Sequence, residues 1–576
     1  MAVYLPGPPY PFGQIDYPVP GQFLAEADAA AALNYRPSRG KALALVAYPY
    51  DVTITHTLYG PPFPFGTPAW PTASGITIPG GTRTVVASTH GFTSRPTDNP
   101  ARAWFAPLLD DVSFEIEMFP GIDPAEAARA GRAGFGRILM KDAEGRFDNL
   151  IGLGWEGRRI EIWRGPRGNT FANYERVAVL TSAGWSDLRA DSKALLIRDQ
   201  QERLYATQLL TLVYGGGGGI DGDAGALGQV KPLAVGFVFH VPPVLIDAAN
   251  LIYQWSHRSV EGVTALKVGG VEWTDMGDVA DYAALVAVVL TNGQFATCNA
   301  LGIVRLGADP QFGVRIDGEG DNVGGYDETR AGIVRRIATT MGTLPLLDPD
   351  EVNLTSLGIL AVAQPAEIGY WWSSPITVGA ALDEVMAGCC GQWWVDLEGK
   401  LNVAQIEPPA TVADFVLDVE TNDPLTFPQL AATLAPRTIT RVGYQRNYGP
   451  QVVGDLAGIV AADQKLYGDE WRYCQASTDS ARTVWPTARE VFIPGGFKRK
   501  ASADAEAARE QAIFSRPLGR WRMAAAIDPF AMLINKTVEV RNWNRYGFAG
   551  SKFLRCVRSF SGRGAVSGTI DLWGTL

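Results

Sequence analysis

Cysteine is scarce in this chain, and its few copies are not spaced as a disulfide framework. The 576 residues contain five cysteines, and the positions are Cys298, Cys389, Cys390, Cys474 and Cys556. Disulfide scaffolds of secreted proteins carry an even number of cysteines at paired spacings. We therefore expect reduced thiols and a protein that is synthesised in a cytoplasm.

Long hydrophobic runs are also lacking. The longest apolar stretches, Ala283–Leu290 and Leu233–Val241, have the length of a strand, whereas a membrane-spanning helix needs about 20 apolar residues. The start, MAVYLPGPPYPFG, has no basic region, and prolines interrupt it. We expect neither a secretory signal nor stable insertion into a membrane.

Motifs of known enzymes are missing too. The sequence contains no H-E-x-x-H, no G-x-S-x-G and no Walker A motif. The four histidines, His56, His90, His240 and His257, are never at the spacing of metal ligands. We predict no catalytic, metal or cofactor site and no enzymatic activity. A glycosidase needs only two placed carboxylates, however, and the 60 acidic residues leave that alternative open.

Positive charge is in deficit. The chain has 50 lysines and arginines against 60 acidic residues, which gives a net charge of −10. Affinity for phosphate comes mainly from lysine and arginine, so the balance argues against specific binding of nucleic acid or of anionic membranes.

Glycine and proline, in contrast, are abundant, at 64 and 38 residues, while 47% of residues are hydrophobic. This composition indicates a turn-rich, mainly β protein, and at roughly 150 residues per domain the chain should hold about four domains. Alternation of apolar residues predicts a strand over Ser113–Met118, and strands on both sides of a glycine-rich stretch within 136–165. Further strands are expected over Thr537–Trp543, Phe553–Phe560 and Thr569–Trp573.

Apolar stripes at helical spacing predict a few helices among these strands. The clearest span 327–342, 374–388 and 502–515. The second runs into a hairpin of Gln392–Leu397 and Lys400–Ile406. An alanine-rich segment over 21–34 and a capping pattern at Asp123-Pro124 indicate two more helices.

A short repeat marks the proline-rich first hundred residues, which hold 16 of the 38 prolines. Gly7–Gly13 reads GPPYPFG, and Gly60–Gly66 reads GPPFPFG. Both copies could pack their aromatic rings inside one N-terminal domain. Alternatively they are two equivalent docking arms, because polyproline segments lose little entropy on binding. On the second interpretation the candidate partner-binding residues are Tyr10, Phe12, Phe63 and Phe65.

Three other features have a functional and a structural interpretation. Asp317, Glu319, Asp321 and Glu328 partly match a calcium loop, but Asn322 stands where that loop needs glycine. We favour a solvated acidic turn that caps the next helix, and leave calcium open. Cys389-Cys390 could be reactive at a helix end, and the pairs Trp371-Trp372 and Trp393-Trp394 could bind sugars. For the cysteines and the tryptophans we favour a place in the core.

Several segments, in order, resemble the tail hub proteins of long-tailed phages and related gene transfer agents. AEGRFDNLIGLGWEGRRIEIWRG resembles their first barrel, and PITVGAALDEVMAGCCGQWWVDLEGKLNVAQI resembles their helix-plus-hairpin unit. TITRVGYQRNYGPQ and YGDEWR resemble strands before the second barrel, and GRGAVSGTIDLWGTL resembles the closing strand. The resemblance covers about residues 110–576.

The resemblance implies a structural protein of the virion at the distal tail tip. Such hubs are homotrimers in which each chain supplies two tube-like β-barrel domains, so that the ring adapts a six-fold tube to a three-fold tip and leaves a channel for DNA. Expected partners are the distal tail protein, the tail tube, the tape measure protein and central fibre or tip proteins. The alternatives are a tail-associated hydrolase of cell-wall glycan and a receptor-binding tip protein.

Combined with the composition, the resemblance predicts five regions. They are a Pro/aromatic-rich region over 1–108, a first hub barrel over 109–235, an inserted β-rich domain over 236–325, an α/β helix-plus-hairpin domain over 326–410 and a second hub barrel with C-terminal strands over 411–576.

Overall fold

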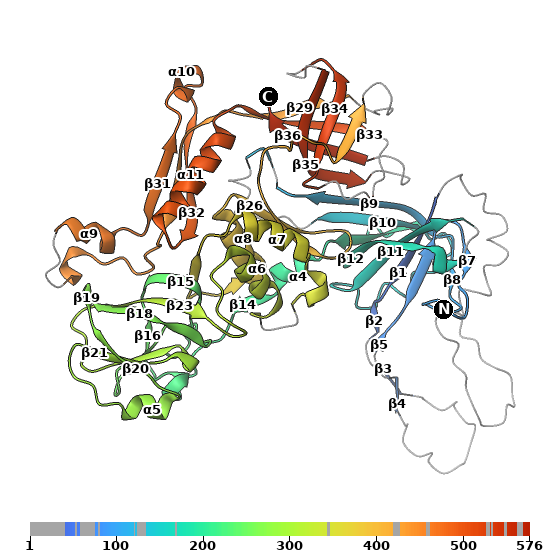
Figure 1. The fold of residues 1–576 in the computed structure, drawn as a ribbon. Coiled ribbons are helices and arrows are strands. Elements are labelled where there is room, and N and C mark those ends of the chain that lie inside the picture. The colour runs from blue at the N-terminus through green and yellow to red at the C-terminus, as the bar shows by residue number, and fades with distance from the viewer. Residues whose placement is uncertain are drawn as a thin grey trace, which may run out of the picture. The chain divides into compact units, whose positions relative to one another are not determined.

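The computed structural model shows a protein built mainly of strands, with helices between them (Figure 1). It describes residues 41–51, 54–57, 75–78, 81–119, 121–123, 134–167, 170–342, 346–418, 427–456, 461–525, 530, 534–545, 550–561 and 568–576. The prediction of a mainly β chain with α+β segments is confirmed. The helix predicted over 21–34 and the one predicted after Asp123 lie outside the described residues.

The chain divides into two compact units. The first comprises Met1–Val112 and Arg137–Ile197, and the second comprises Ser113–Gly136 and Arg198–Leu576. Strand β9 (Leu109–Glu117) therefore starts in the first unit and ends in the second. The five-region division stays a prediction.

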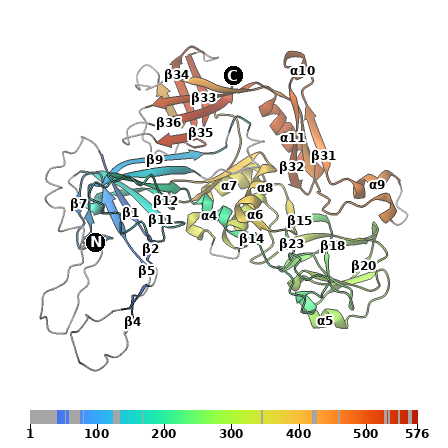
Figure 2. The same ribbon diagram turned by 180° about the vertical axis from the view of Figure 1, so that it is seen from behind.

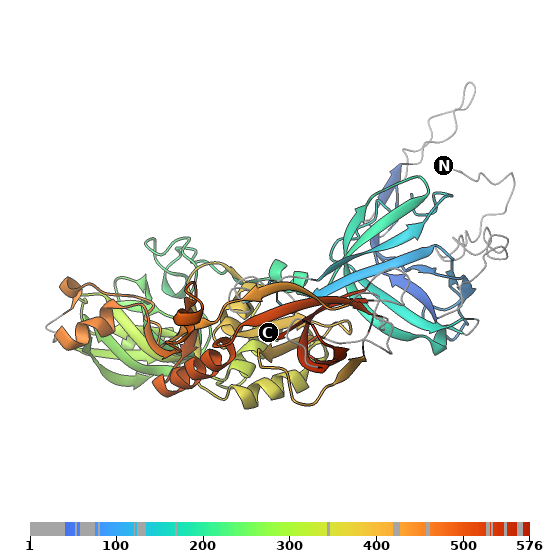
Figure 3. The same ribbon diagram turned by 90° about the horizontal axis from the view of Figure 1, so that it is seen from above.

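The first unit is organised around a sheet with the strand order β10-β13-β12-β11-β1-β6, drawn in blue to cyan in Figures 1 and 3. Strand β1, which lies between β11 and β6, is apolar at every position from Ala42 to Ala47, and all six residues are buried. Such a continuous run is typical of a strand covered on both faces. The bounds are β1 (Lys41–Ala47), β6 (Val85–Ser88), β10 (Phe135–Lys141), β11 (Arg159–Pro166), β12 (Glu175–Ser186) and β13 (Ser192–Arg198).

Short strand pairs and an aromatic cluster complete this unit. Phe92, Phe105 and Phe171 pack with Tyr174 against one side of β1. The short pairs are β2 (Tyr50–Asp51) with β5 (Gly81–Thr82), β3 (Ile54–Thr57) with β4 (Gly75–Ile78), and β7 (Phe92–Thr93) with β8 (Trp104–Phe105). The two strands predicted around the glycine-rich stretch are β10 and β11, as expected.

The C-terminal sheet of the second unit has the order β29-β33-β36-β35. The first half of β35 pairs with β34, and the second half pairs with β9, where Ile116 lies opposite Ser559. Strands more than 400 positions apart in sequence thus share one sheet. The bounds are β28 (Phe415–Asp418), β29 (Gln429–Leu434), β33 (Leu518–Ala525), β34 (Thr537–Trp543), β35 (Gly550–Ser561) and β36 (Gly568–Thr575).

Two five-stranded sheets form the part of the second unit that is coloured green. One has the order β19-β18-β23-β15-β24, and the other has the order β16-β17-β22-β21-β20. The bounds are β15 (Leu233–Val241), β16 (Val244–Asp247), β17 (Ile252–Gln254), β18 (Val260–Val268), β19 (Val271–Glu272), β20 (Thr274–Asp278), α5 (Tyr282–Ala287), β21 (Gln294–Cys298), β22 (Ile303–Leu306), β23 (Val314–Asp321) and β24 (Gly369–Trp372).

Helices α6, α7 and α8 gather together (Figure 2), and α7 and α8 contact the hairpin β26–β27. Thr329 caps α6, and Thr377 caps α8, each with its side chain accepting a backbone N–H of the first turn. The predicted apolar stripes of both helices are buried in one core. The bounds are α4 (Gln201–Ala206), β14 (Gln208–Leu210), α6 (Arg330–Thr339), α7 (Leu354–Ala363), β25 (Ile376–Thr377), α8 (Val378–Ala387), β26 (Gly391–Val395) and β27 (Leu401–Gln405).

The remaining long helix, α11 (Lys500–Phe514), lies against a three-stranded sheet with the order β31-β30-β32. It corresponds to the helix predicted over 502–515. The bounds of its neighbours are β30 (Arg437–Tyr444), α9 (Ala461–Gly468), β31 (Arg472–Ser477), α10 (Ala481–Val484) and β32 (Arg489–Phe497).

Candidate functional site

The four residues proposed from the repeat lie outside the described part of the chain. Tyr10, Phe12, Phe63 and Phe65 all belong to segments that the structure does not describe. Their role as partner-binding residues stays a prediction, and the site described next comes from other residues.

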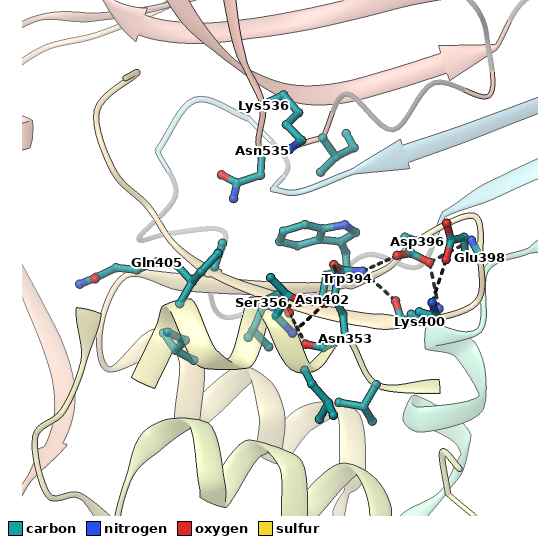
Figure 4. A pocket seen from close by; sticks show the side chains of 18 of the residues that line it. Asn353, Ser356, Trp394, Asp396, Glu398, Lys400, Asn402, Gln405, Asn535 and Lys536 are labelled. Carbon is teal, nitrogen blue, oxygen red and sulfur yellow. Dashed lines mark hydrogen bonds and ion pairs between the residues drawn. The ribbon is translucent and has the colours of Figure 1, made fainter. Parts of the chain in front are cut away.

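A groove of about 940 Å³ lies in the second unit between helix α7, hairpin β26–β27 and the segment 534–536. Figure 4 shows Asn535 and Lys536 on one side, and Trp394 with the hairpin residues on the other. Its volume is within the range of about 300–1,000 Å³ that is usual for ligand pockets. What it can bind depends on the side chains of its walls that have no partner within the protein.

Helix α7 supplies the apolar wall. Asn353 caps it by accepting hydrogen bonds from the backbone N–H groups of Thr355 (3.1 Å) and Ser356 (3.3 Å). One side of the helix, with Leu357 and Leu360, is buried in the core. On the other side Ile359 is 66% exposed, and it lines the groove.

The exposed apolar surface of α7 continues beyond the groove. Leu354, which also lines the groove, is 60% exposed, and Val362 is 83% exposed. The helix carries no charge from Leu354 to Ala363. Isolated exposed apolar residues are normal, but a contiguous apolar helix face is typical of a surface that another protein covers.

The polar groups of the groove are already engaged with each other. Asn353 donates to Asn402 (2.7 Å), and Asn402 donates to Asp396 (2.7 Å), which forms the chain of dashed lines in Figure 4. Asp396 also accepts the backbone N–H of Lys400 (2.9 Å), and burial raises the pKa of its carboxyl. Arg555 donates to the carbonyl oxygens of Glu407, Pro408 and Asn535. What this groove offers a partner is therefore mainly its apolar wall, which suits protein docking better than catalysis.

The acidic residues that resembled a calcium loop are placed differently from our expectation. Asp317, Glu319 and Asp321 lie on strand β23, so the predicted solvated turn is wrong. Asp317 accepts from Lys267 (2.7 Å), and Asp321 accepts from Arg258 (2.7 Å). Backbone pairing of β23 with β15 and β18 keeps this segment extended despite its turn-like sequence. Lysine and arginine side chains neutralise its carboxylates.

Glu328, the last position of that pattern, accepts from Lys498 (2.9 Å), which also lies 3.6 Å from Glu319. Within the described residues no group of three or more histidine, cysteine or acidic side chains could hold a metal ion.

The histidines and cysteines with described side chains are packing residues. His240 is buried, and burial lowers its pKa to about 3, so the ring is neutral at pH 7. Cys389 and Cys390 are buried, as predicted, and burial raises the pKa of Cys389 to about 11. A protonated buried thiol is a poor nucleophile.

The paired tryptophans are buried as well, so the core interpretation is confirmed for them. Trp372 donates its indole N–H to Glu384 (2.8 Å), and Trp393 donates to Asp383 (2.7 Å). The sequence reasoning missed α7 and its exposed face altogether. The signal that could have found it is Asn353, whose side chain caps the helix. In the described part of the chain no helix is both long and apolar enough to cross a membrane.

Comparisons with known proteins give distant structural neighbours only. No protein-family model and no curated protein matches the chain. The 43 kDa tail protein of prophage MuSo2 from Shewanella oneidensis has 10% identity and a TM-score of 0.30, over 81% of this chain and 94% of that chain. The prophage tail protein gp18 from Listeria monocytogenes has 7% identity and a TM-score of 0.28, over 80% and 87%.

A third neighbour is the E. coli protein c3393, a component of the type VI secretion system with structural similarity to the bacteriophage T4 tail proteins gp27 and gp5. It has 8% identity and a TM-score of 0.28, over 81% of this chain and 74% of that chain. Because these TM-scores are low, we base the proposed function on the chain's own residues. Solved structures similar to this chain thus include two prophage tail proteins and a component of the type VI secretion system.

Proposed function

We propose that this chain is a structural tail hub protein of a phage virion. Three copies form a ring at the distal end of the tail tube. Each copy supplies two β modules, so the ring has six of them and can meet a six-fold tube on one side and a three-fold tip on the other. A closed ring repeats one interface, so association stops at three copies.

The observation that carries this proposal is the pair of β modules that strand β9 connects. One is the sheet of the first unit, and the other is the C-terminal sheet of the second. In the second, Glu115 of β9 accepts two hydrogen bonds from Arg558 of β35 (2.8 and 2.7 Å), and Glu117 accepts one from Arg520 (2.6 Å). The first segment and the last strands of the second unit are therefore joined in one module, which suits a rigid ring component.

The apolar face of α7 supports a role in assembly. We assign it to contact with one of the expected neighbours: the distal tail protein, the tail tube, the tape measure protein or a central fibre or tip protein. Core positions of protein interfaces are depleted of charged residues, and helix α7 contains no charged residue.

DNA passes through the ring without specific binding in this proposal. Each chain carries a net charge of −10, so a trimer carries three times that charge, and lysine and arginine contacts are needed to retain phosphates. Tight binding of duplex DNA by the purified ring at ~0.15 M salt would contradict this part of the proposal.

A cell-wall hydrolase is less well supported. Burial raises the pKa of both Asp199 and Glu510 to about 8, a value that suits an acid catalyst at neutral pH. However, both carboxyl groups are inside the protein, at 1% and 0% exposure, where a polymeric glycan cannot reach them.

The oligomeric state of the purified chain tests the proposal. We expect sedimentation or mass photometry at micromolar concentration to give three times the 62.0 kDa mass of one chain. A stable monomer or dimer under the same conditions would argue against a hub. Purification with a trimer-forming tail partner would then show whether assembly requires that partner.

A further inference from the structure

A second pocket, of about 490 Å³, lies wholly within the first unit. It sits at the turn between Gly154 and Arg158, beside Gly184 near the end of strand β12. Its size is that of a small-ligand pocket. The side chains that matter for its chemistry are Tyr50, Trp155, Glu156, Arg158 and Trp185.

The aromatic part of the pocket is held in place from behind. Trp155 is buried, and its indole N–H donates to the carbonyl oxygen of Leu150 (2.6 Å). The Trp155 ring meets the Trp185 ring edge to face, at 5.0 Å between centroids and an angle of 79°. Phe147 contacts Trp185 from another side, at 5.7 Å. Trp185 is therefore a fixed aromatic surface and not a side chain that must be ordered on binding.

Trp185 also has an unused hydrogen-bond donor. Its indole N–H is buried and has no acceptor among the described residues. Because this nitrogen is enclosed while the ring is fixed, the part of Trp185 that a ligand can contact is its ring and not its N–H.

Two charged side chains at the pocket form no ion pair with any described residue. Glu156 and Arg158 are exposed, and within the described residues neither forms an ion pair. The guanidinium of Arg158 lies instead over the Tyr50 ring, at 4.8 Å. By contrast, the next arginine along the chain, Arg159, pairs with Glu161 at 2.8 Å. The pocket thus combines the aromatic ring of Trp185 with a carboxylate and a guanidinium that form no ion pair in the described part of the chain.

We propose that this pocket binds a saccharide. A sugar ring has an apolar C–H face for the ring of Trp185, hydroxyl donors for Glu156, and oxygen acceptors for Arg158. A nucleic acid would need several cations, and the pocket offers one. A purely apolar ligand would leave the charged groups of Glu156 and Arg158 without partners. This pocket shares no residue with the groove at α7 and does not require the trimer. A negative binding result would therefore leave the proposed hub function untouched.

The test is saccharide binding to the full chain. Maltotriose, mannotriose and chitotriose serve as probes, with saturation-transfer NMR and tryptophan fluorescence as readouts. We expect at least one probe to bind with a Kd of about 1 mM or tighter. Glu156→Gln and Arg158→Gln should each weaken that binding at least about tenfold. Because both side chains are exposed, these variants should fold normally.

Glu144→Gln is the matched control. Glu144 is an exposed carboxylate of the same unit that lies outside the pocket and pairs with Arg146 (2.6 Å). This variant should bind the probe like the unchanged chain. The proposal is overturned if none of the three probes binds at about 10 mM, or if Glu156→Gln and Glu144→Gln bind equally well.

Discussion

Arg437 and Asp123 form a buried ion pair at 2.8 Å, although they are 314 positions apart in sequence. Arg437 is fully buried. It also donates to Glu510 of α11 (3.1 Å), and its guanidinium lies 3.5 Å from the centre of the Phe514 ring. One arginine therefore joins strand β30, helix α11 and the segment that follows β9.

Replacing Asp123 should strongly destabilise the second unit. Removal of one partner from a buried ion pair leaves an uncompensated charge and typically costs about 3–5 kcal/mol. We expect Asp123→Asn to lower the free energy of unfolding by about 3 kcal/mol or more, because Arg489 loses its contact with Asp123 as well. Calorimetry of the unchanged chain and the variant measures the difference.

Glu398→Gln provides a comparison for this effect. Glu398 pairs with Lys400 at 2.9 Å, but both side chains are largely exposed, so its removal should hardly change the unfolding transition. Equal effects of the two substitutions would mean that the buried pair has no special role.

Asp199 should make stability depend on pH. Its carboxylate accepts from the backbone N–H groups of Gly134 (2.6 Å) and Gln201 (2.9 Å), yet burial raises its pKa from 3.8 to about 8. The folded state therefore holds this proton more tightly than the unfolded state does. The resulting stabilisation is complete below about pH 4 and is lost as the pH rises towards 8.

An Asp199→Asn variant removes that titration but keeps the shape of the side chain. Its one amide oxygen can still accept from one of the two backbone N–H groups that the carboxylate binds. We expect the variant to gain stability relative to the unchanged chain by about 1 kcal/mol or more between pH 5 and pH 8. Thermal unfolding of both proteins at each pH measures the gain. The titration of Glu510 is present in both proteins, so it cancels in their difference. A difference that does not change with pH would show that Asp199 is ionised in the folded protein.

The five cysteines should be inert in the folded protein. All are buried, and burial raises the pKa of Cys389 to about 11 and of Cys556 to about 12. Iodoacetamide at pH 8 should therefore label none of them until the chain is unfolded in denaturant, where mass spectrometry should find five labels. Rapid labelling of Cys389 under native conditions would contradict its place in the core.

The repeated arms give a prediction that concerns assembly alone. If Gly7–Gly13 and Gly60–Gly66 are docking arms, Phe12→Ala with Phe65→Ala should reduce assembly with tail partners and leave the thermal stability of the isolated chain unchanged. A loss of about 3–5 kcal/mol for each phenylalanine would instead show that the repeat packs in a core. Co-purification with partners and calorimetry of the same variant distinguish the two outcomes.

Local patterns predicted the helices whose faces differ in polarity. The stripe Ile333, Val334 and Ile337 revealed α6, because its other side is polar. Helix α7 was missed since the run LTSLGILAVA is uncharged all round and shows no periodicity. Its cap Asn353 was the one local signal available.

Long-range pairing explains the other differences. Asp317 and Asp321 read as a loop, but β23 lies between β15 and β18, where Lys267 and Arg258 pair with the two acids. Similarly, the groove brings α7 together with residues 534–536, and no local pattern connects segments that far apart in sequence.

An electron microscopy image of the purified oligomer tests the central claim most directly. The proposed hub predicts a ring with three-fold symmetry, six β modules around a central hole and one copy of the green-coloured part of each chain at three equivalent positions. Class averages that show single chains, or an oligomer with two-fold symmetry and no central hole, would contradict the assignment of this protein as a tail hub.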